Sequence, residues 1–203
     1  MSEQKVYIIE DDEAVRESEE MMLESIDQAF ESFVDAPSFL EAYQDDMMGC
    51  ILLDVRMPGM NGIELHKTLI EKGCTMPVIF VTGHGDIQMA VDAMQRGAAD
   101  FVTKPYREQE LLDKVYAALS HDADNRNKSV EVNQIKERLA TLTARESEVM
   151  EMMVEGKANK VIGFDLEISE RTVEIHRGRV MKKMGTHSLA QLVQMVLRAR
   201  GEV

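Results

Sequence analysis

Three aspartates stand where predicted strands end, and their carboxylates are the groups in this 203-residue sequence best suited to chemistry. Asp11 and Asp12 follow the apolar run at residues 6–9, and Asp54 follows the run at residues 50–53. Neighbouring strands lie about 4.8 Å apart, so the three carboxylates would converge at one sheet edge. Like charges that close raise one another's pKa unless a cation joins them, and such oxygen ligands favour Mg²⁺, or Mn²⁺ in its place. The alternative is that Asp11 and Asp12 only cap the helix that follows.

Two further predicted strand ends carry side chains that bind phosphate. Thr82, followed by Gly83, closes one apolar run, and Lys104, followed by Pro105, closes another. A phosphoryl group on Asp54 would have the cation on one side, with the Lys104 ammonium and the Thr82 hydroxyl on the other. Asp54 would then be the nucleophile that forms an aspartyl phosphate. The alternative is a solvated lysine and a threonine that only ends its strand.

The first 120 residues alternate short apolar runs with stretches of helical periodicity. This pattern predicts five β-then-α units and an α/β fold with a doubly wound, five-stranded parallel sheet. In such a sheet, functional groups gather at the carboxyl ends of the strands. The predicted strands lie at residues 6–9, 32–34, 50–53, 78–81 and 101–103. The predicted helices lie at residues 13–28, 37–45, 61–72, 86–96 and 107–120.

Charge divides the chain into two parts. The net charge is −14, but residues 1–125 hold 9 basic and 26 acidic residues, a net charge of −17, whereas residues 126–203 hold 14 basic and 11 acidic residues, a net charge of +3. This asymmetry indicates two domains with different partners. The polar stretch 122–138 predicts a linker between a domain at 1–121 and a domain at 139–203. Four apolar residues with helical spacing favour a partly helical linker, which packs on a neighbouring domain or forms a coiled coil: Val132, Ile135, Leu139 and Leu142.

Helix-start signals in the C-terminal part predict an all-α domain of four helices. Thr143 begins a capping box, and the next helix covers residues 159–166. Ser169 caps a third helix, and Ser188 opens the fourth. A helix, a short turn and a second helix form a helix-turn-helix, whose second helix enters the major groove of DNA. Cations suited to phosphate contacts surround it, although such residues are often only solvated: Lys157, Lys160, Arg171, Arg177, Arg179, Lys182 and Lys183.

Cysteine usage and hydropathy favour a cytoplasmic protein. Cys50 and Cys74 have no metal-ligand spacing, so we expect two reduced, partly buried thiols. No apolar run approaches the roughly 18–20 residues that span a bilayer, and the polar N-terminus does not resemble a signal peptide. We therefore expect no membrane contact. The 16 methionines are expected to fill cores between helices rather than to bind a metal.

Residues 4–120 resemble the receiver domain of two-component response regulators, which has a flavodoxin-like (CheY-like) fold. The resemblance is carried by Glu10-Asp11-Asp12, by residues 54–62, by Val81-Thr82-Gly83 and by Lys104-Pro105. It implies a sensor histidine kinase as partner, with Asp54 as the phosphoacceptor and a cis Lys104–Pro105 peptide. It also implies a Mg²⁺ site made of Asp12, Asp54, the backbone carbonyl of Arg56 and, through water, Asp11.

The same resemblance implies a conformational switch. Thr82 and Phe101 occupy the positions of a threonine–aromatic pair that moves when phosphate arrives, and Gly83 and Lys104 complete the phosphate-binding set. The surface of the fourth helix, fifth strand and fifth helix would be the output face and often a dimer surface. Arg56 and His84 flank the path of an attacking water, and we hypothesise that they tune phosphate lifetime; an ordinary exposed loop histidine is the alternative for His84.

Residues 140–203 resemble the NarL/FixJ (LuxR-type) DNA-binding domain. The resemblance is carried by residues 142–146, 156–160, 168–173 and 182–184. It implies a groove-facing set of Arg171, Thr172, Glu174, Ile175 and Gly178, and a set facing the DNA backbone of Lys160, His176, Arg177 and Lys182. The sequence departs from the pattern at two positions. Glu174 stands where relatives often carry lysine, and Ala158 replaces the usual polar cap of the helix that begins at Asn159.

The two resemblances predict a response regulator in which phosphorylation of Asp54 favours a homodimer that binds double-stranded DNA and controls transcription. We expect no turnover enzyme, only a chain that accepts and loses its own phosphoryl group. One alternative is a phosphohydrolase of the haloacid-dehalogenase type. Such an enzyme needs an aspartate as general acid two residues after Asp54, where this chain has Arg56. The other is a phosphorelay or protein-binding module with a vestigial C-terminal domain.

Overall fold

The structure, a computed structural model, describes residues 4–83, 91–92 and 94–202. The chain divides into two compact units, Met1–Asn125 and Arg126–Val203. The apolar core clusters of the N-terminal unit are separate from that of the C-terminal unit. No helix within the described residues has the length and apolarity that a bilayer crossing requires.

Five parallel strands form one sheet in the N-terminal unit, in the order β2-β1-β3-β4-β5. The strands are β1 (Lys5–Ile9), β2 (Phe30–Phe33), β3 (Gly49–Asp54), β4 (Val78–Thr82) and β5 (Asp100–Thr103). β3 and β4 are buried along their whole length, as expected for parallel strands that are covered on both faces. β1 pairs with both β2 and β3, so the strand order reverses there. Doubly wound sheets hold their functional groups at the carboxyl ends of the strands that meet at such a reversal.

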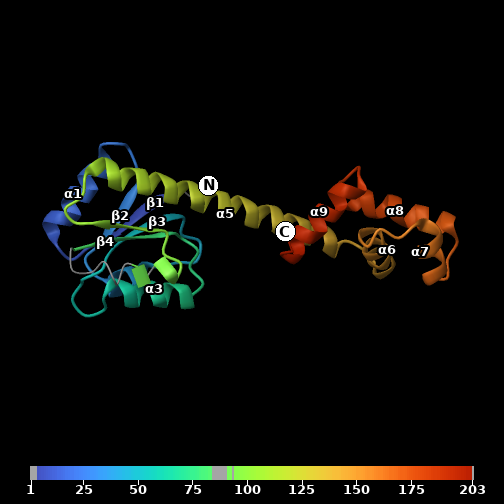
Figure 1. The fold of residues 1–203 in the computed structure, drawn as a ribbon, viewed down its shortest axis with the longest axis horizontal. Coiled ribbons are helices and arrows are strands. Elements are labelled where there is room, and N and C mark those ends of the chain that lie inside the picture. Colours follow the sequence, from blue (N-terminus) through green and yellow to red (C-terminus); the bar gives the residue numbers. More distant parts are fainter. Residues whose placement is uncertain (1–3, 84–90, 93, 203) are drawn as a thin grey trace. The chain divides into compact units, whose positions relative to one another are not determined.

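Helices cover both faces of this sheet (Figure 1). α1 and the first half of α5 pack on one face through a core that includes Leu23, Leu111 and Val115. α2 and α3 pack on the other face around Phe39 and Leu65. The bounds are α1 (Glu13–Glu24), α2 (Ala36–Ala42), α3 (Gly62–Glu71) and α5 (Glu108–Ala140). The predicted doubly wound α/β fold is confirmed, while most of the helix predicted at 86–96 lies outside the described residues.

The first helix ends earlier than predicted. α1 stops at Glu24 rather than at residue 28, because Asp27 adopts a positive φ of 53° and the Gln28 N–H donates back to the Leu23 carbonyl. Ile26, beyond the end of the helix, still packs against the same core as Leu23. The apolar spacing therefore continued past the end of the helix and misled the prediction.

The polar stretch at 122–138 is helical throughout, as part of the 33-residue helix α5. Polarity suggested a break, but this stretch contains no glycine or proline that would stop a helix. Its last turns belong to the C-terminal unit, where Ile135 is buried and Leu139 packs against the same core. Packing of these residues on the C-terminal helices, one of the two predicted possibilities, is confirmed.

Asp122 anchors the middle of α5 within the N-terminal unit. Its side chain is buried, and Oδ2 accepts hydrogen bonds from the Gly49 backbone N–H at 2.9 Å and from Gln4 Nε2 at 3.3 Å. Gln4 Nε2 also donates to the Leu119 carbonyl at 2.9 Å. The helix is therefore tied to the amino ends of β1 and β3, the edge of the sheet opposite the aspartates.

Four helices with the predicted caps follow in the C-terminal unit. They are α6 (Ala144–Val154), α7 (Asn159–Asp165), α8 (Glu170–Met184) and α9 (Leu189–Arg200). Thr143 forms the capping box, Ser169 and Ser188 cap α8 and α9, and Ala158 makes no side-chain cap bond, as predicted. The core contains six of the expected methionines, either buried or packed against it: Met150, Met152, Met153, Met181, Met184 and Met195. Both cysteines in the N-terminal unit are free thiols.

Candidate functional site

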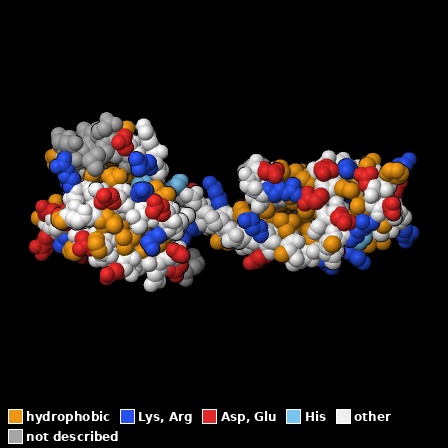
Figure 2. All heavy atoms as spheres, turned by 90° about the horizontal axis from the view of Figure 1, so that it is seen from below, with side chains coloured by type: hydrophobic (Ala, Val, Ile, Leu, Met, Phe, Trp, Pro, Cys, Tyr) orange, Lys and Arg blue, Asp and Glu red, His pale blue; other side chains and the backbone are white. Residues whose placement is uncertain are grey.

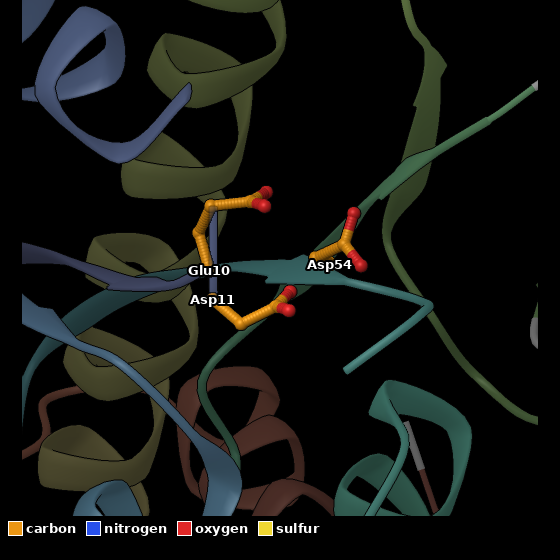
Figure 3. Close-up of side chains that lie close together, drawn as sticks. All are labelled: Glu10, Asp11 and Asp54. Atoms are coloured by element: carbon orange, nitrogen blue, oxygen red, sulfur yellow. The ribbon is translucent and has the colours of Figure 1, made fainter. Parts of the chain in front are cut away.

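Three carboxylates converge at the carboxyl ends of β1 and β3. Ile9 pairs in register with Leu53, so the residues that follow β1 lie beside the end of β3. Glu10, Asp11 and Asp54 each offer an oxygen atom within 4.8 Å of the others (Figure 3). Glu10 and Asp54 are almost fully buried, whereas Asp11 is exposed. The site is therefore open to solvent on the side of Asp11.

Lys104 supplies the positive charge that this cluster needs. Its Nζ donates to Asp54 Oδ1 at 2.8 Å and to Glu10 Oε2 at 2.6 Å. Burial raises the pKa of Asp54, and the hydrogen bond and charge of Lys104 oppose that rise. Burial lowers the pKa of Lys104, but its bonds to the two carboxylates outweigh this effect and leave the pKa raised. The lysine is thus held in its charged form against the acidic cluster.

The backbone around Asp54 fixes the second carboxylate oxygen. The Arg56 N–H donates to Asp54 Oδ2 at 2.5 Å. Gly62, at the start of α3, lies so close that a Cβ on it would be 2.1 Å from the Asp54 carbonyl oxygen. Only glycine permits this approach, so Gly62 is a positioning residue that the sequence analysis did not assign. Its signal was an Asn-Gly pair at the start of the helix predicted at residues 61–72.

Asp12 caps α1, and Glu10 stands in the cluster. Asp12 Oδ1 accepts from the Ala14 N–H at 2.9 Å and the Val15 N–H at 3.2 Å. The capping alternative therefore describes Asp12 in this structure, but Asp11 joins the acidic cluster. The sequence pattern assigns no separate role to Glu10, which precedes the two aspartates. Its role as a bonding partner of Lys104 could have been found from its place directly at the strand end.

Thr82 and Phe101 lie on adjacent strands near the cluster. Thr82 is fully buried at the end of β4, and its hydroxyl donates to the Gly83 carbonyl at 3.2 Å. The Lys104 N–H donates to the Thr82 carbonyl at 2.7 Å, which ties the two phosphate-binding candidates together. Phe101 is half-buried on β5. The Lys104–Pro105 peptide is cis, as the resemblance implied, and His84 lies outside the described residues.

In the C-terminal unit, α7, a short turn and α8 form the predicted helix-turn-helix. Val173, Val180 and Met184 hold one side of α8 in the core. The opposite side carries exposed residues of the predicted groove-facing set: Arg171, Glu174, Ile175 and Gly178. Thr172 is half-buried, and its hydroxyl shares a 2.8 Å hydrogen bond with Ser169 at the cap. This side is the one that α8 can present to a partner.

The basic residues of this unit fall into two groups. Lys157 pairs with Asp165 at 3.2 Å, and Lys183 pairs with Glu146 at 2.6 Å, so both serve the fold. A second group forms no hydrogen bond or ion pair within the described part of the chain: Lys160, Arg171, Arg177, Arg179 and Lys182. Figure 2 shows acidic and basic side chains interspersed over the visible face of the unit. Charge alone therefore does not mark a nucleic-acid surface, and the cations without a protein partner are the better indicator.

His176, also predicted to face the DNA backbone, is half-buried. Its Nδ1 atom is buried and has no hydrogen-bond partner among the described residues.

Two family models match the chain. Residues 6–116 match the response regulator receiver domain, and residues 140–196 match the bacterial regulatory proteins of the luxR family. The transcriptional regulatory protein FixJ of Azorhizobium caulinodans is 45% identical over 194 residues, which cover 96% of this chain and 92% of that protein. The response regulator protein TodT of Pseudomonas putida is 41% identical over 96% of this chain and 86% of its own length.

Solved structures agree with these matches. The response regulator StyR aligns with a TM-score of 0.85 at 39% identity, covering 96% of this chain and 98% of that structure. Full-length FixJ from B. japonicum aligns with a TM-score of 0.62 at 37% identity, covering 99% of each chain. A receiver joined to a LuxR-type DNA-binding domain defines a two-component response regulator. The chain belongs to the family of these regulators that includes the FixJ proteins.

Proposed function

We propose that Asp54 accepts a phosphoryl group from a sensor histidine kinase, and that this modification controls DNA binding by the C-terminal domain. The observation that carries the proposal is the position of Asp54. It lies at the end of β3, bonded to the Lys104 ammonium and beside the carboxylates of Glu10 and Asp11. A carboxylate held between a cation and other oxygen ligands is poised to act as a nucleophile toward phosphorus.

The residues around Asp54 fit a Mg²⁺ ion. The oxygen atoms of Glu10, Asp11 and Asp54 within 4.8 Å of one another are hard ligands of the kind Mg²⁺ prefers. As the resemblance implies, we assign the ion to Asp12, Asp54 and the Arg56 carbonyl, with Asp11 bound through water. Both cap bonds of Asp12 use Oδ1, so Oδ2 is the oxygen that it would offer to the ion. When bound, the ion would neutralise oxygens of the transferred group.

Phosphoryl transfer would use the remaining side chains directly. One Asp54 oxygen bonds to phosphorus while the phosphorus–nitrogen bond of the kinase phosphohistidine breaks, and the electron pair stays on the imidazole. Lys104 would move its hydrogen bond from Asp54 Oδ1 to a phosphoryl oxygen, and the Thr82 hydroxyl would turn from Gly83 to another. A hollow of about 590 Å³ lies beside the cluster, between the start of α1 and Lys104-Pro105-Tyr106.

The output step would be a shift between two populations. A Thr82 hydroxyl drawn toward phosphate vacates space beside β5, which Phe101 can fill, so the surface around β5 changes. We propose that this surface then binds a second copy of the chain. Two copies on DNA would present two α8 helices to two half-sites of an operator.

Acetyl phosphate with Mg²⁺ tests the proposal. We expect it to raise the DNA affinity of the intact chain but not of Asp54→Asn. Asp46→Asn, an exposed loop substitution of the same kind, should behave as the unchanged chain. Equal responses of Asp54→Asn and the unchanged chain would refute the assignment of Asp54.

The phosphohydrolase alternative makes a different prediction. Arg56 cannot act as the general acid that turnover requires, so a steady-state phosphatase assay should show at most the slow release of the chain's own phosphoryl group. Multiple turnovers that depend on Asp54 would favour the enzyme. A DNA footprint would in turn exclude a vestigial C-terminal domain.

A further inference from the structure

The exposed side of α8 combines features that its own fold does not explain. Helix-turn-helix proteins contact base edges with the first turns of the second helix, which here contain Arg171, Glu174 and Ile175. Ile175 is 49% exposed although it is a large apolar residue. Glu174 is also exposed, and a carboxylate is unexpected on a surface that faces phosphates.

Among the residues that the structure describes, Glu174 has no neutralising partner. Arg171 and Arg177 stand three residues before and after it, yet within the described chain neither forms an ion pair or a hydrogen bond with it. Four residues before it stands Glu170, and four residues after it stands Gly178, which has no side chain. In a complex with DNA this carboxylate would weaken binding unless a hydrogen-bond donor on the DNA met it.

Gly178 is the second unexplained feature. It lies in the middle of α8, where glycine lowers helix stability. A Cβ built on it meets no atom within 4 Å, and Gly178 is not among the glycines with positive φ. Neither packing nor backbone conformation therefore requires glycine. The remaining explanation for this glycine is contact with a partner, because the missing side chain lets a partner approach the α8 backbone closely.

We propose that the Glu174 carboxylate accepts a hydrogen bond from a cytosine in each half-site, and this rests on the proposed DNA-binding function. Gly178, which has no side chain, would allow α8 to lie close enough to the DNA for that contact. In the major groove cytosine presents the N4 amino donor, whereas guanine and thymine present acceptors that repel a carboxylate. Adenine presents a donor beside the N7 acceptor, so only one carboxylate oxygen is well placed there. The order of preference at this position is cytosine, then adenine, then thymine and guanine.

Selection from a pool of random-sequence duplex DNA tests this inference with the full chain, treated with acetyl phosphate and Mg²⁺. The unchanged chain should enrich a motif with a cytosine at one position of each half-site. Replacing that cytosine with thymine should weaken binding about tenfold, the range of one direct base contact. Glu174→Gln should shift the preference to adenine, because an amide pairs with adenine N6 and N7. Glu174→Ala should remove the preference at that position alone.

One control variant separates the effect from a general change of charge. Glu170→Gln removes the same charge one turn earlier and should keep the cytosine preference. Gly178→Ala should raise the melting temperature of the C-terminal unit and weaken specific binding. An enriched motif that Glu174→Gln and Glu174→Ala leave unchanged would overturn this inference while the proposed function stands. Failure of the unchanged chain to bind any DNA would overturn the proposed function itself.

Discussion

Glu19 is a buried acid whose ionisation should destabilise the N-terminal unit. It lies on α1 with 1% of its surface exposed, and Tyr106 Oη donates to it at 2.8 Å. Burial raises its pKa from 4.5 to about 7, although the Tyr106 hydrogen bond opposes the rise. Since the folded-state pKa lies above the unfolded one, the unfolded chain ionises first as pH rises. The protein therefore loses stability between the two values, and the loss is complete above the folded pKa.

The magnitude follows from the two pKa values. A rise from 4.5 to about 7 corresponds to about 3.4 kcal/mol at high pH, since one pKa unit is worth about 1.4 kcal/mol. Glu19→Gln keeps an oxygen that accepts from Tyr106 but cannot ionise. The free energy of unfolding of Glu19→Gln, minus that of the unchanged chain, should therefore grow by about 2.5 kcal/mol from about pH 5 to about pH 8.

Tyrosine fluorescence during urea unfolding measures this difference in the full chain. The protein has no tryptophan, and its 4 tyrosines, at positions 7, 43, 106 and 116, all lie in the N-terminal unit. The signal therefore reports that unit alone. Glu17→Gln, an exposed substitution on the same helix, should give a difference that does not vary with pH. A constant difference for Glu19→Gln over this pH range would refute the reasoning.

Further predictions concern stability and binding. Gly62→Ala should destabilise the N-terminal unit by at least about 2 kcal/mol in urea unfolding, because its Cβ would overlap the Asp54 carbonyl; an unchanged midpoint would contradict this. Gly178→Ala should instead stabilise the C-terminal unit by about 1 kcal/mol, since alanine favours a helix and meets no atom there. Lys183→Ala should lower the melting temperature of the C-terminal unit, because it breaks the ion pair with Glu146. Lys182→Ala should leave that melting temperature unchanged. It should instead reduce the slope of log DNA affinity against log salt concentration by about 1. Hydrogen bonds from Lys183 and the Thr143 N–H lower the pKa of Glu146 from 4.5 to about 2. The stability that this carboxylate contributes should therefore be complete above about pH 4.5 and be lost as the pH falls from there toward 2.

The sequence predicted the sheet and the convergence of the site residues at one of its edges, because the alternation of apolar runs and helical stretches indicates which strands are neighbours. Buried parallel strands appear as apolar runs, and residues at their carboxyl ends meet at one edge. Asp54 and Lys104, which are 50 residues apart in the chain, were placed together in this way. Helix starts were equally predictable, because Thr143 and Ser169 carry the caps in the sequence itself.

The sequence did not reveal which oxygen bonds to which group. Glu10, Asp11 and Asp12 are adjacent, and only the backbone path after β1 decides that Asp12 turns to cap α1 while Glu10 turns to Lys104. The extent of α5 was missed for a related reason. A polar surface is compatible with a linker and with a solvated helix alike, and the difference lies in the absence of glycine and proline.

The bonds of Asp122 decide how the receiver can be separated from the rest of the protein. A fragment that ends at residue 121 lacks this carboxylate, which leaves the Gly49 N–H buried at the start of β3 without its acceptor. An unmet buried donor costs about 1–3 kcal/mol, a large share of the stability of a small domain. A fragment that continues to Asn125 keeps the bond. The fragment that ends at Asn125 is therefore the one to use as an isolated receiver in phosphorylation assays.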